Sequence, residues 1–485
     1  MKKFYRKLLG WMLLVCLCWA QVAGEDAGAT SAGESPAATQ TAQPEPRKVS
    51  PQEAEELFRS IDEIVKFSSQ ETALPLKHPI KRRMVSRDEV VAYLSKHMAE
   101  DEDARRLQRS ELVLKKFGLL PRDFDLQKFL VTLLREQVAG FYDPKTKTVN
   151  LLDWVDPEQQ KPVLAHELTH ALQDQSFGLE KWMKAGAADL AQSKKAPTTD
   201  DIESDEVTSA RQALVEGQAM VVLIDYMLVP MGQSMSSSPQ IAEALKEGML
   251  VGTADSIQFR NAPNFIKQAL TFPYRYGLDF VAAVLAKQGK EKAFAGMFTN
   301  PPRSTRQIME PATYLSGEKI EPLRLPDFAR IFRNYERFDV GAIGEFDVAL
   351  LVDEYAGSEA SRQLYPQWRG GYYYAARPKD DTSAPLGLLY VSRWSNVERA
   401  AEFAAIYAKS LTKRYRRARE AVSDDSKPLN LDALSTMTGS HIWLTEEGPV
   451  VIVVEGETVL VTESLDPQAT GEVEKELFAA AVAGR

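Results

Sequence analysis

The chain has 485 residues and a formal net charge of −9, from 59 basic and 68 acidic side chains. An acidic chain is a poor candidate for nucleic-acid binding, because a phosphate backbone attracts basic surfaces. The length is enough for two or three domains. Composition therefore predicts a multidomain globular protein with no nucleic-acid partner.

Residues 1–24 have the features of a signal peptide. Four basic side chains precede an apolar run from Leu8 to Ala20, and small residues follow it. This run is shorter than the roughly 20 residues of a membrane span. We therefore expect an exported protein, periplasmic or secreted, with no stable membrane span after cleavage. Cys16 and Cys18 both lie in this segment, so the mature chain has no cysteine for a disulfide or a metal site.

Residues 25–49 are rich in small and polar residues and show no apolar periodicity, which is typical of a flexible linker. Two capping-box patterns follow, in which Ser50 and Ser86 stand three residues before Glu53 and Glu89. Helical apolar spacing continues after each of them. The sequence therefore predicts a helical portion upstream of residue 140.

Residues 140–152 predict a small β-hairpin. Two short β-prone runs flank the turn sequence Asp143-Pro144-Lys145-Thr146. An exposed strand edge can bind an extended peptide through main-chain hydrogen bonds, so this hairpin is a candidate substrate edge. The alternative interpretation is an ordinary structural hairpin.

Residues 166–170 read His-Glu-Leu-Thr-His, although the whole chain has only five histidines. On a helix, positions i and i+4 share one face, so His166 and His170 can bind a single metal ion. Apolar residues recur at helical spacing around the motif, Pro162 suits a first turn, and Gly178 suits a helix end. The alternative interpretation is a helix whose polar stripe happens to carry two histidines.

The motif predicts metal-assisted hydrolysis, with peptide bonds as the first substrate class. A catalytic Zn²⁺ site has three protein ligands and one water, and Glu167 is placed to act as the general base on that water. A hydrogen-bond donor for the oxyanion is also needed. Three tyrosines are candidates that the sequence does not separate: Tyr142, Tyr274 and Tyr276.

A carboxylate is the expected third ligand, because the remaining histidines lie in a loop, on an apolar helix stripe and in the C-terminal region. These are His78, His97 and His441. Asp174 is eight residues beyond His166, a rise of about 12 Å that a short side chain cannot span to a shared ion. Asp174 is expected instead to orient His170, or to be a solvated surface residue.

Glu216 is the better candidate for the third ligand. It lies in a predicted helix over about 203–229, and its helical neighbours are mostly small or apolar. A buried carboxylate is costly unless a metal or a cation compensates it, and a buried ion pair with an arginine is the alternative. Gly217 would let a second helix approach closely. Three other acidic residues are expected in an exposed polar turn: Glu203, Asp205 and Glu206.

Beyond about residue 335 the composition changes, and 336–485 form a predicted second domain. Strands are expected over 372–376, 386–391, 442–444, 450–454 and 458–462, and helices over 396–419 and 471–481. This order predicts an antiparallel sheet with helices on one face.

The end of the predicted helix over 396–419 is basic: Lys409, Lys413, Arg414, Arg416, Arg417 and Arg419. Such a run is usually a solvated face that complements the helix dipole. The alternative is a surface of the C-terminal domain for an anionic cell-envelope partner.

Four segments carry a family resemblance: Glu136–Pro144, His166–Gln175, Ala213–Ala219 and Pro301–Ile308. Through them the chain resembles the gluzincin group of HEXXH zinc metallopeptidases. It is more closely similar to a group of uncharacterised exported bacterial proteins, chiefly over residues 80–320. The resemblance implies zinc ligands at His166, His170 and Glu216, with Glu167 as general base.

The expected fold class is α+β. A mostly helical, zincin-like catalytic domain with a small edge hairpin is expected over 50–335, followed by a smaller α+β domain over 336–485. The expected function is that of an exported zinc metallopeptidase with a peptide or protein substrate. The alternatives are a zinc hydrolase of another envelope amide or ester, and an inactive zincin-like binding module.

Overall fold

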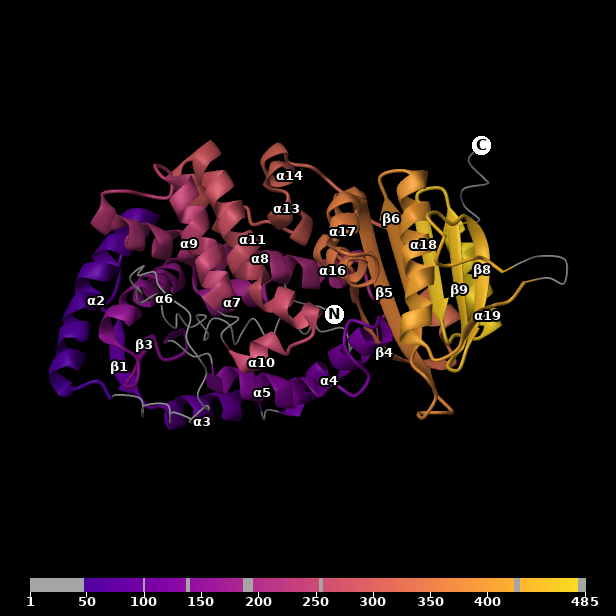
Figure 1. Ribbon diagram of the computed structural model, residues 1–485, viewed down its shortest axis with the longest axis horizontal. Coiled ribbons are helices and arrows are strands. Elements are labelled where there is room, and N and C mark those ends of the chain that lie inside the picture. Colours follow the sequence, from indigo (N-terminus) through magenta and orange to yellow (C-terminus); the bar gives the residue numbers. More distant parts are fainter. Residues whose placement is uncertain are drawn as a thin grey trace, which may run out of the picture.

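The computed structural model describes residues 48–98, 101–136, 140–185, 195–252, 256–422 and 428–478. The predicted signal peptide (1–24) and nearly all of the predicted linker (25–49) lie outside these residues. Helices form most of the described chain up to residue 331, and an antiparallel seven-stranded sheet forms the C-terminal part at the other end of the molecule's long axis (Figure 1). The α+β class is confirmed.

The first part contains sixteen described helical segments of very different length. They are α2 (Pro51–Thr72), α3 (Arg87–Met98), α4 (Asp101–Lys116), α5 (Leu126–Glu136), α6 (Pro157–Phe177), α7 (Leu179–Lys184), α8 (Thr199–Leu228), η1 (Val229–Met231), α9 (Pro239–Gly252), α10 (Ile257–Arg260), α11 (Asn264–Gln288), η3 (Lys292–Gly296), α12 (Met297–Thr299), α13 (Thr305–Met309), α14 (Pro311–Ser316) and α15 (Phe328–Ile331). Its described strands are β1 (Lys81–Val85), β2 (Phe141–Asp143) and β3 (Thr148–Leu152).

Local sequence signals set the ends of the helix that carries the motif. Asp156 accepts a hydrogen bond from the Glu158 N–H and caps α6, with Pro157 as its first residue. The expectation that Pro162 lies in the first turn was therefore wrong, because the cap stands upstream and Pro162 lies inside the helix. Gly178 ends α6 in the left-handed conformation, as predicted.

The hairpin prediction is confirmed. Strands β2 and β3 pair antiparallel, and β1 pairs parallel with β3, giving the strand order β1-β3-β2. Strand β2 is therefore an edge of this small sheet. Both β2 and β3 pack against α6, so the hairpin lies beside the motif helix.

Helix α8 is the central helix of the first part and packs against α6 and α11. It begins at Thr199, earlier than predicted, because Thr198 and Asp201 form a capping box. Asp205 and Glu206 were expected in an exposed turn, but both are buried in this helix.

One stretch within the described residues, Thr199–Met231, is long and apolar enough to cross a membrane. Of its apolar window, 72% is buried inside the protein. A helix in the core of a folded domain gives the same result, so this stretch is weak evidence for a membrane span.

The C-terminal sheet has the strand order β4-β5-β6-β10-β9-β8-β7, and all its pairings are antiparallel. Its described elements are β4 (Tyr335–Ala342), α16 (Glu345–Ala356), α17 (Ser358–Leu364), η4 (Tyr365–Gln367), β5 (Trp368–Pro378), β6 (Gly387–Trp394), α18 (Val397–Arg414), β7 (Ala418–Glu420), β8 (Gly439–Thr445), β9 (Gly448–Glu455), β10 (Thr458–Glu463) and α19 (Pro467–Phe478). The last predicted helix, 471–481, begins earlier than expected, and its residues 479–481 lie outside the described part.

Helices cover both faces of this sheet, which corrects the prediction of one covered face. Tyr373 and Tyr390 face α16 and α18 and belong to a buried apolar cluster that also reaches α2. Tyr372 and Leu389 face the other way and pack in a second cluster with α15 and α19. Alternate side chains of β5 and β6 therefore enter different cores.

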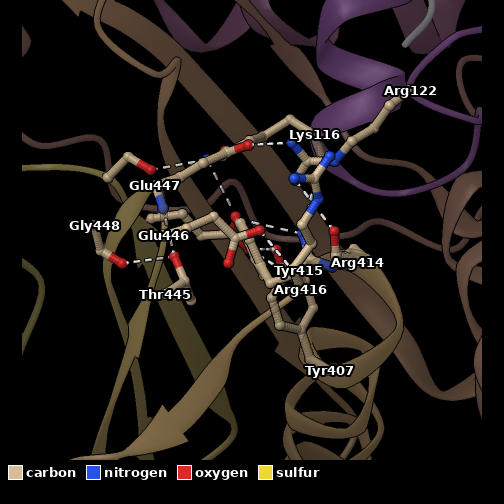
Figure 2. A network of polar contacts seen from close by, with 12 residues as sticks. Lys116, Arg122, Tyr407, Arg414, Tyr415, Arg416, Thr445, Glu446, Glu447 and Gly448 are labelled. Atoms are coloured by element: carbon tan, nitrogen blue, oxygen red, sulfur yellow. Dashed lines mark hydrogen bonds and ion pairs between the residues drawn. The ribbon is translucent and has the colours of Figure 1, made fainter.

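A buried network of charged groups joins the two parts of the molecule (Figure 2). Arg414, the last residue of α18, pairs with Glu463 of β10 at 2.7 Å, and both side chains are almost fully buried. Lys116 of α4 lies 3.8 Å from the same carboxylate and 2.9 Å from that of Glu447. Contacts from α4 thus reach the C-terminal sheet.

This network changes the interpretation of the basic run near residue 414. The predicted helix to residue 419 ends at Arg414, whose guanidinium is buried rather than solvated. The Arg416 and Arg417 backbone N–H groups donate to the Glu446 carboxylate, and β7 begins at Ala418. The run is therefore not one continuous basic helix face, and an anionic envelope partner stays a prediction.

Candidate metal centre

Three buried side chains predicted from the sequence come together between α6 and α8. His166 Nε2 lies 3.1 Å from Glu216 Oε2, and His170 Nε2 lies 3.4 Å from the same oxygen. The two imidazole Nε2 atoms are 3.0 Å apart. His166 and His170 come from successive turns of α6, whereas Glu216 comes from the facing side of α8. These three side chains, the metal group, could hold a metal ion.

The spacing of these atoms fits a small tetrahedral ion. Bonds of roughly 2.0–2.1 Å in tetrahedral geometry place neighbouring ligand atoms about 3.3 Å apart. The three observed separations are 3.0, 3.1 and 3.4 Å. Within the described residues, the group has three members, which leaves one tetrahedral position for a water or a substrate atom.

The electrostatics of the group favour a bound positive charge. Burial alone lowers the pKa of His170, but the Glu216 and Glu167 carboxylates outweigh this effect and raise it to about 9. Burial alone raises the pKa of Glu216, yet the two histidines hold it at about 2. Three lone-pair atoms that face one buried point repel one another unless a proton or a cation lies between them.

Gln173 fixes the orientation of His170. Its amide nitrogen donates to the Val215 carbonyl at 3.1 Å and to Gln218 Oε1 at 2.9 Å. Its oxygen therefore faces His170 Nδ1, at 2.9 Å, and accepts the proton there. This tautomer leaves the His170 Nε2 lone pair directed at the metal group.

A π-helical turn holds Gln218, the residue that accepts a hydrogen bond from Gln173. The Gln218 amide nitrogen donates to the carbonyls of Ala293 and Phe294 in η3, at 2.8 and 3.0 Å. A π-turn disrupts the regular helical ladder and is often found next to functional sites. A chain of hydrogen bonds thus runs from η3 through Gln218 and Gln173 to His170.

The prediction that Asp174 orients His170 was wrong. Asp174 is buried, but its carboxylate accepts hydrogen bonds from the Tyr142 hydroxyl at 2.7 Å and from Lys147 Nζ at 2.6 Å. It also accepts from the Leu179 N–H. Asp174 therefore ties the hairpin and the next helix to α6, and the neighbouring Gln173 contacts the imidazole.

Glu216 is held by its own helix and by a close helix contact. The Gln212 amide, one turn earlier, donates to Glu216 Oε1 at 2.9 Å and leaves Oε2 facing the imidazoles. A Cβ added to Gly217 would lie 2.1 Å from the Gly277 carbonyl oxygen of α11. The predicted close approach of a second helix at Gly217 is therefore found.

Glu167 lies on the side of α6 that faces the hairpin. Its carboxylate is buried and accepts a hydrogen bond from the Tyr142 backbone N–H at 2.7 Å. Tyr142 lies in the edge strand β2, so this N–H points to α6 and not to β3. The strand edge, the carboxylate and the metal group therefore lie next to one another.

The three candidate tyrosines have different surroundings. The Tyr274 ring of α11 lies 6.3 Å from the His166 ring, measured between centroids. The Tyr142 hydroxyl is bonded to Asp174, and the Tyr276 ring packs against aromatic rings of α11 and α16. Tyr274 is therefore the candidate beside the metal group.

Of the other three histidines, the two with described side chains do not join the group. His78 is exposed, and its backbone contacts the Gln175 side chain. His441 of β8 pairs with Glu420 at 2.7 Å. The side chain of His97 lies outside the described part of the chain.

Comparison with protein-family models, curated proteins and solved structures finds no match to this chain. The resemblance to the gluzincins therefore stays a prediction.

Proposed function

We propose that the protein is an exported zinc-dependent metallopeptidase with a zincin-like catalytic part. The observation that carries the proposal is the convergence of His166, His170 and Glu216 at a tetrahedral spacing, with Glu167 beside them. Two imidazole nitrogens and one carboxylate oxygen are a ligand set that catalytic zinc uses. Within the described residues the group leaves one tetrahedral position free, as a catalytic site does and a closed structural site does not.

When bound, zinc would polarise the scissile carbonyl and lower the pKa of a bound water. The residues of the chain then divide the other tasks. Glu167 takes the proton from the water and passes it to the leaving amine. The Tyr142 N–H holds the Glu167 carboxylate in place through its 2.7 Å hydrogen bond.

Peptides are the favoured substrate class because the metal group lies beside a strand edge. The Tyr142 N–H at this edge already donates to Glu167, so an extended peptide would pair with β2 through the other edge-facing groups of the strand and bring one of its carbonyl groups to the metal position. Tyr274 is the tyrosine that we assign as hydrogen-bond donor to the oxyanion, because its ring lies beside that of His166.

The direct test replaces Glu167 by Gln, which keeps the shape of the side chain and all three metal ligands. We expect zinc content to be unchanged and hydrolysis to fall by about 10²-fold or more. Denatured protein and a mixed peptide library serve as substrates. Glu158→Gln is a matched control, because Glu158 is an exposed carboxylate at the start of the same helix.

Wild-type cleavage that survives Glu167→Gln would contradict this mechanism. Cleavage of an envelope glycopeptide but of no plain peptide would assign the site to another envelope amide or ester. Zinc binding without hydrolysis of any substrate would favour the binding-module alternative.

Tyr274→Phe tests the assignment of the oxyanion donor. We expect kcat to fall with little change in KM, because the hydroxyl acts on the transition state. Tyr276→Phe, on the same helix, is the control and should retain kcat. An equal loss in both variants would mean that the effect comes from the packing of α11.

A further inference from the structure

A cavity of about 400 Å³ lies away from the metal group. It is lined by the first turns of α8, the segment 303–325 and strands β4 and β5, and it opens to solvent. Its apolar lining includes Ile202, Leu323, Leu325 and Tyr372. A volume of this size is within the range of small-ligand pockets, which are usually apolar with a few polar groups.

The cavity shares helix α8 with the metal group but not its position. Glu206 lines the cavity and lies ten residues before Glu216 on this helix, an axial separation of about 15 Å. A ligand in the cavity would therefore not touch the metal ligands.

Most of the less exposed charged groups in the cavity wall already have partners within the protein. The Glu206 carboxylate accepts from the Thr305 N–H at 2.9 Å and from the Thr305 hydroxyl. Arg306 pairs with the buried Glu345 at 2.6 Å and with Glu318 at 3.2 Å. The contacts of Thr305 and Arg306 hold the start of the segment 303–325 against α8 and α16, and the Arg306–Glu318 pair links it to the rest of the segment.

Glu203 differs from these groups. Its side chain is half-buried and has no hydrogen bond or ion pair within the part of the chain that the structure describes. Burial raises its pKa, and the charge of Arg303 offsets this effect only in part. A half-buried carboxylate without a partner costs free energy that a ligand cation would recover.

The other charged side chains of the lining are exposed at the mouth. They are Arg303, Lys319 and Glu321. These two cations and one anion make the mouth polar, which suits the polar backbone of a ligand that enters from solvent. The cavity therefore combines an apolar lining, the half-buried carboxylate of Glu203 and a polar mouth.

We propose that this cavity binds the amino-terminal residue of a short peptide. The ammonium group would pair with Glu203, and an apolar side chain would pack on Leu323, Leu325 and Tyr372. The peptide backbone would leave past Arg303 and Lys319. The choice of peptides as the source of the ammonium group rests on the proposed function, whereas the binding chemistry of the cavity does not.

The test is isothermal titration calorimetry on the full chain after removal of metal with a chelator. Phenylalanine amide and N-acetyl-phenylalanine amide are the two probes. They share the apolar ring, but only the first has an ammonium group. We expect saturable one-to-one binding of phenylalanine amide, and binding of the acetylated probe that is weaker by about tenfold or more.

Glu203→Gln should weaken the binding of phenylalanine amide by a similar factor. Glu321→Gln is the matched control, because it removes an exposed carboxylate from the mouth, and it should bind as the wild type does. Equal affinity for both probes, or unchanged affinity in Glu203→Gln, would overturn the proposal. Absence of saturable binding to the wild type would overturn it as well.

The metal-free protein separates this result from the proposed function. A chain that binds phenylalanine amide but never hydrolyses a peptide would retain the cavity proposal and lose the peptidase. Binding that appears only after zinc is restored would place the ligand at the metal group and overturn the cavity proposal.

Discussion

Gln173 determines which nitrogen of His170 is available to a metal. Its amide nitrogen donates to Val215 and Gln218, so its oxygen accepts from His170 Nδ1. The same side chain crosses from α6 to α8 next to Glu216. One glutamine therefore sets the tautomer of one ligand and the distance to the helix of another.

Gln173→Met should weaken zinc binding by about 10- to 100-fold, because the His170 proton is no longer held on Nδ1. Gln173→Glu keeps an acceptor for that proton and should retain more of the affinity. The measurement is the zinc dissociation constant by competition with a chelator. Gln175→Met is the control, because the side chain of this partly exposed glutamine hydrogen-bonds the loop at residues 77–78. Equal affinities in Gln173→Met and in the wild type would contradict the assigned role.

The sequence predicted the members of the buried His-His-Glu group better than the residues that support them. Spacing identified His166 and His170, and the apolar neighbours of Glu216 indicated its burial. On a helix, Gln173 and Asp174, three and four residues after His170, can both reach its imidazole, and Asp174 was the residue predicted to contact it. Asp174 instead accepts hydrogen bonds from Tyr142 and Lys147, which are distant in sequence. Local spacing therefore could not show which of the two residues contacts His170.

The close contact between α8 and α11 fixes the position of the helix that carries Glu216. Gly217 and Gly277 face each other, and an added Cβ at either position would lie 2.1 Å from a backbone oxygen of the other helix. Backbone atoms cannot move aside as a flexible side chain can. The separation of these helices therefore depends on two glycines, one of which is adjacent to a metal ligand.

Gly217→Ala should lower the free energy of unfolding by about 1–3 kcal/mol or more, through overpacking of the two helices. It should also weaken zinc binding, because α8 must shift to relieve the clash. Gly248→Ala in α9 is the matched control, since an added Cβ there has no atom within 4 Å. It should be neutral or slightly stabilising, as expected for Ala in a helix. Retention of wild-type stability and zinc affinity in Gly217→Ala would contradict this view of the contact.

Strong local sequence signals were sufficient to predict helix starts, whereas strands and helix ends that depend on tertiary contacts were missed. The capping boxes at Ser50 and Ser86 were found as predicted. Strand β4 was missed because its first half is polar, and its buried second half is set by packing on α8, which places Asp205 against Gly341. The helix predicted to residue 419 ends at Arg414, where Tyr415 and Arg414 both turn to Glu463. These endings depend on partners that are distant in sequence.

The whole molecule is joined by a continuous apolar core and by the charge network of Figure 2. The network converges on Glu463, which accepts hydrogen bonds from Arg414, Tyr407 and Tyr415 and lies near Lys116. Burial alone would raise the pKa of Glu463, but Arg414 and Lys116 hold it below its ordinary value of 4.5. The carboxylate therefore stays charged in the folded protein.

This network makes the stability of the protein sensitive to acid. Because the folded-state pKa of Glu463 is below 4.5, its contribution is present above that pH and is lost as the pH falls through the folded-state pKa. Glu463→Gln should cost about 3–5 kcal/mol near pH 7, since Arg414 loses its buried partner, and should reduce the loss of stability in acid. Urea unfolding between pH 3 and pH 7 measures both effects.

Glu359→Gln is the control for the buried network, because it breaks an exposed ion pair with Arg362. It should change stability little at any pH. If Glu463→Gln behaves like this control, the network does not join the two parts of the molecule in the way described.

The central claim is that His166, His170 and Glu216 hold a zinc ion, and the zinc content of the purified chain tests it most directly. Protein expressed in zinc-replete medium is purified without chelators and its metal is measured by elemental analysis. We expect about one zinc per chain in the wild type and a much lower content in His170→Ala and Glu216→Ala. A wild-type chain that is folded and contains no zinc would contradict the account.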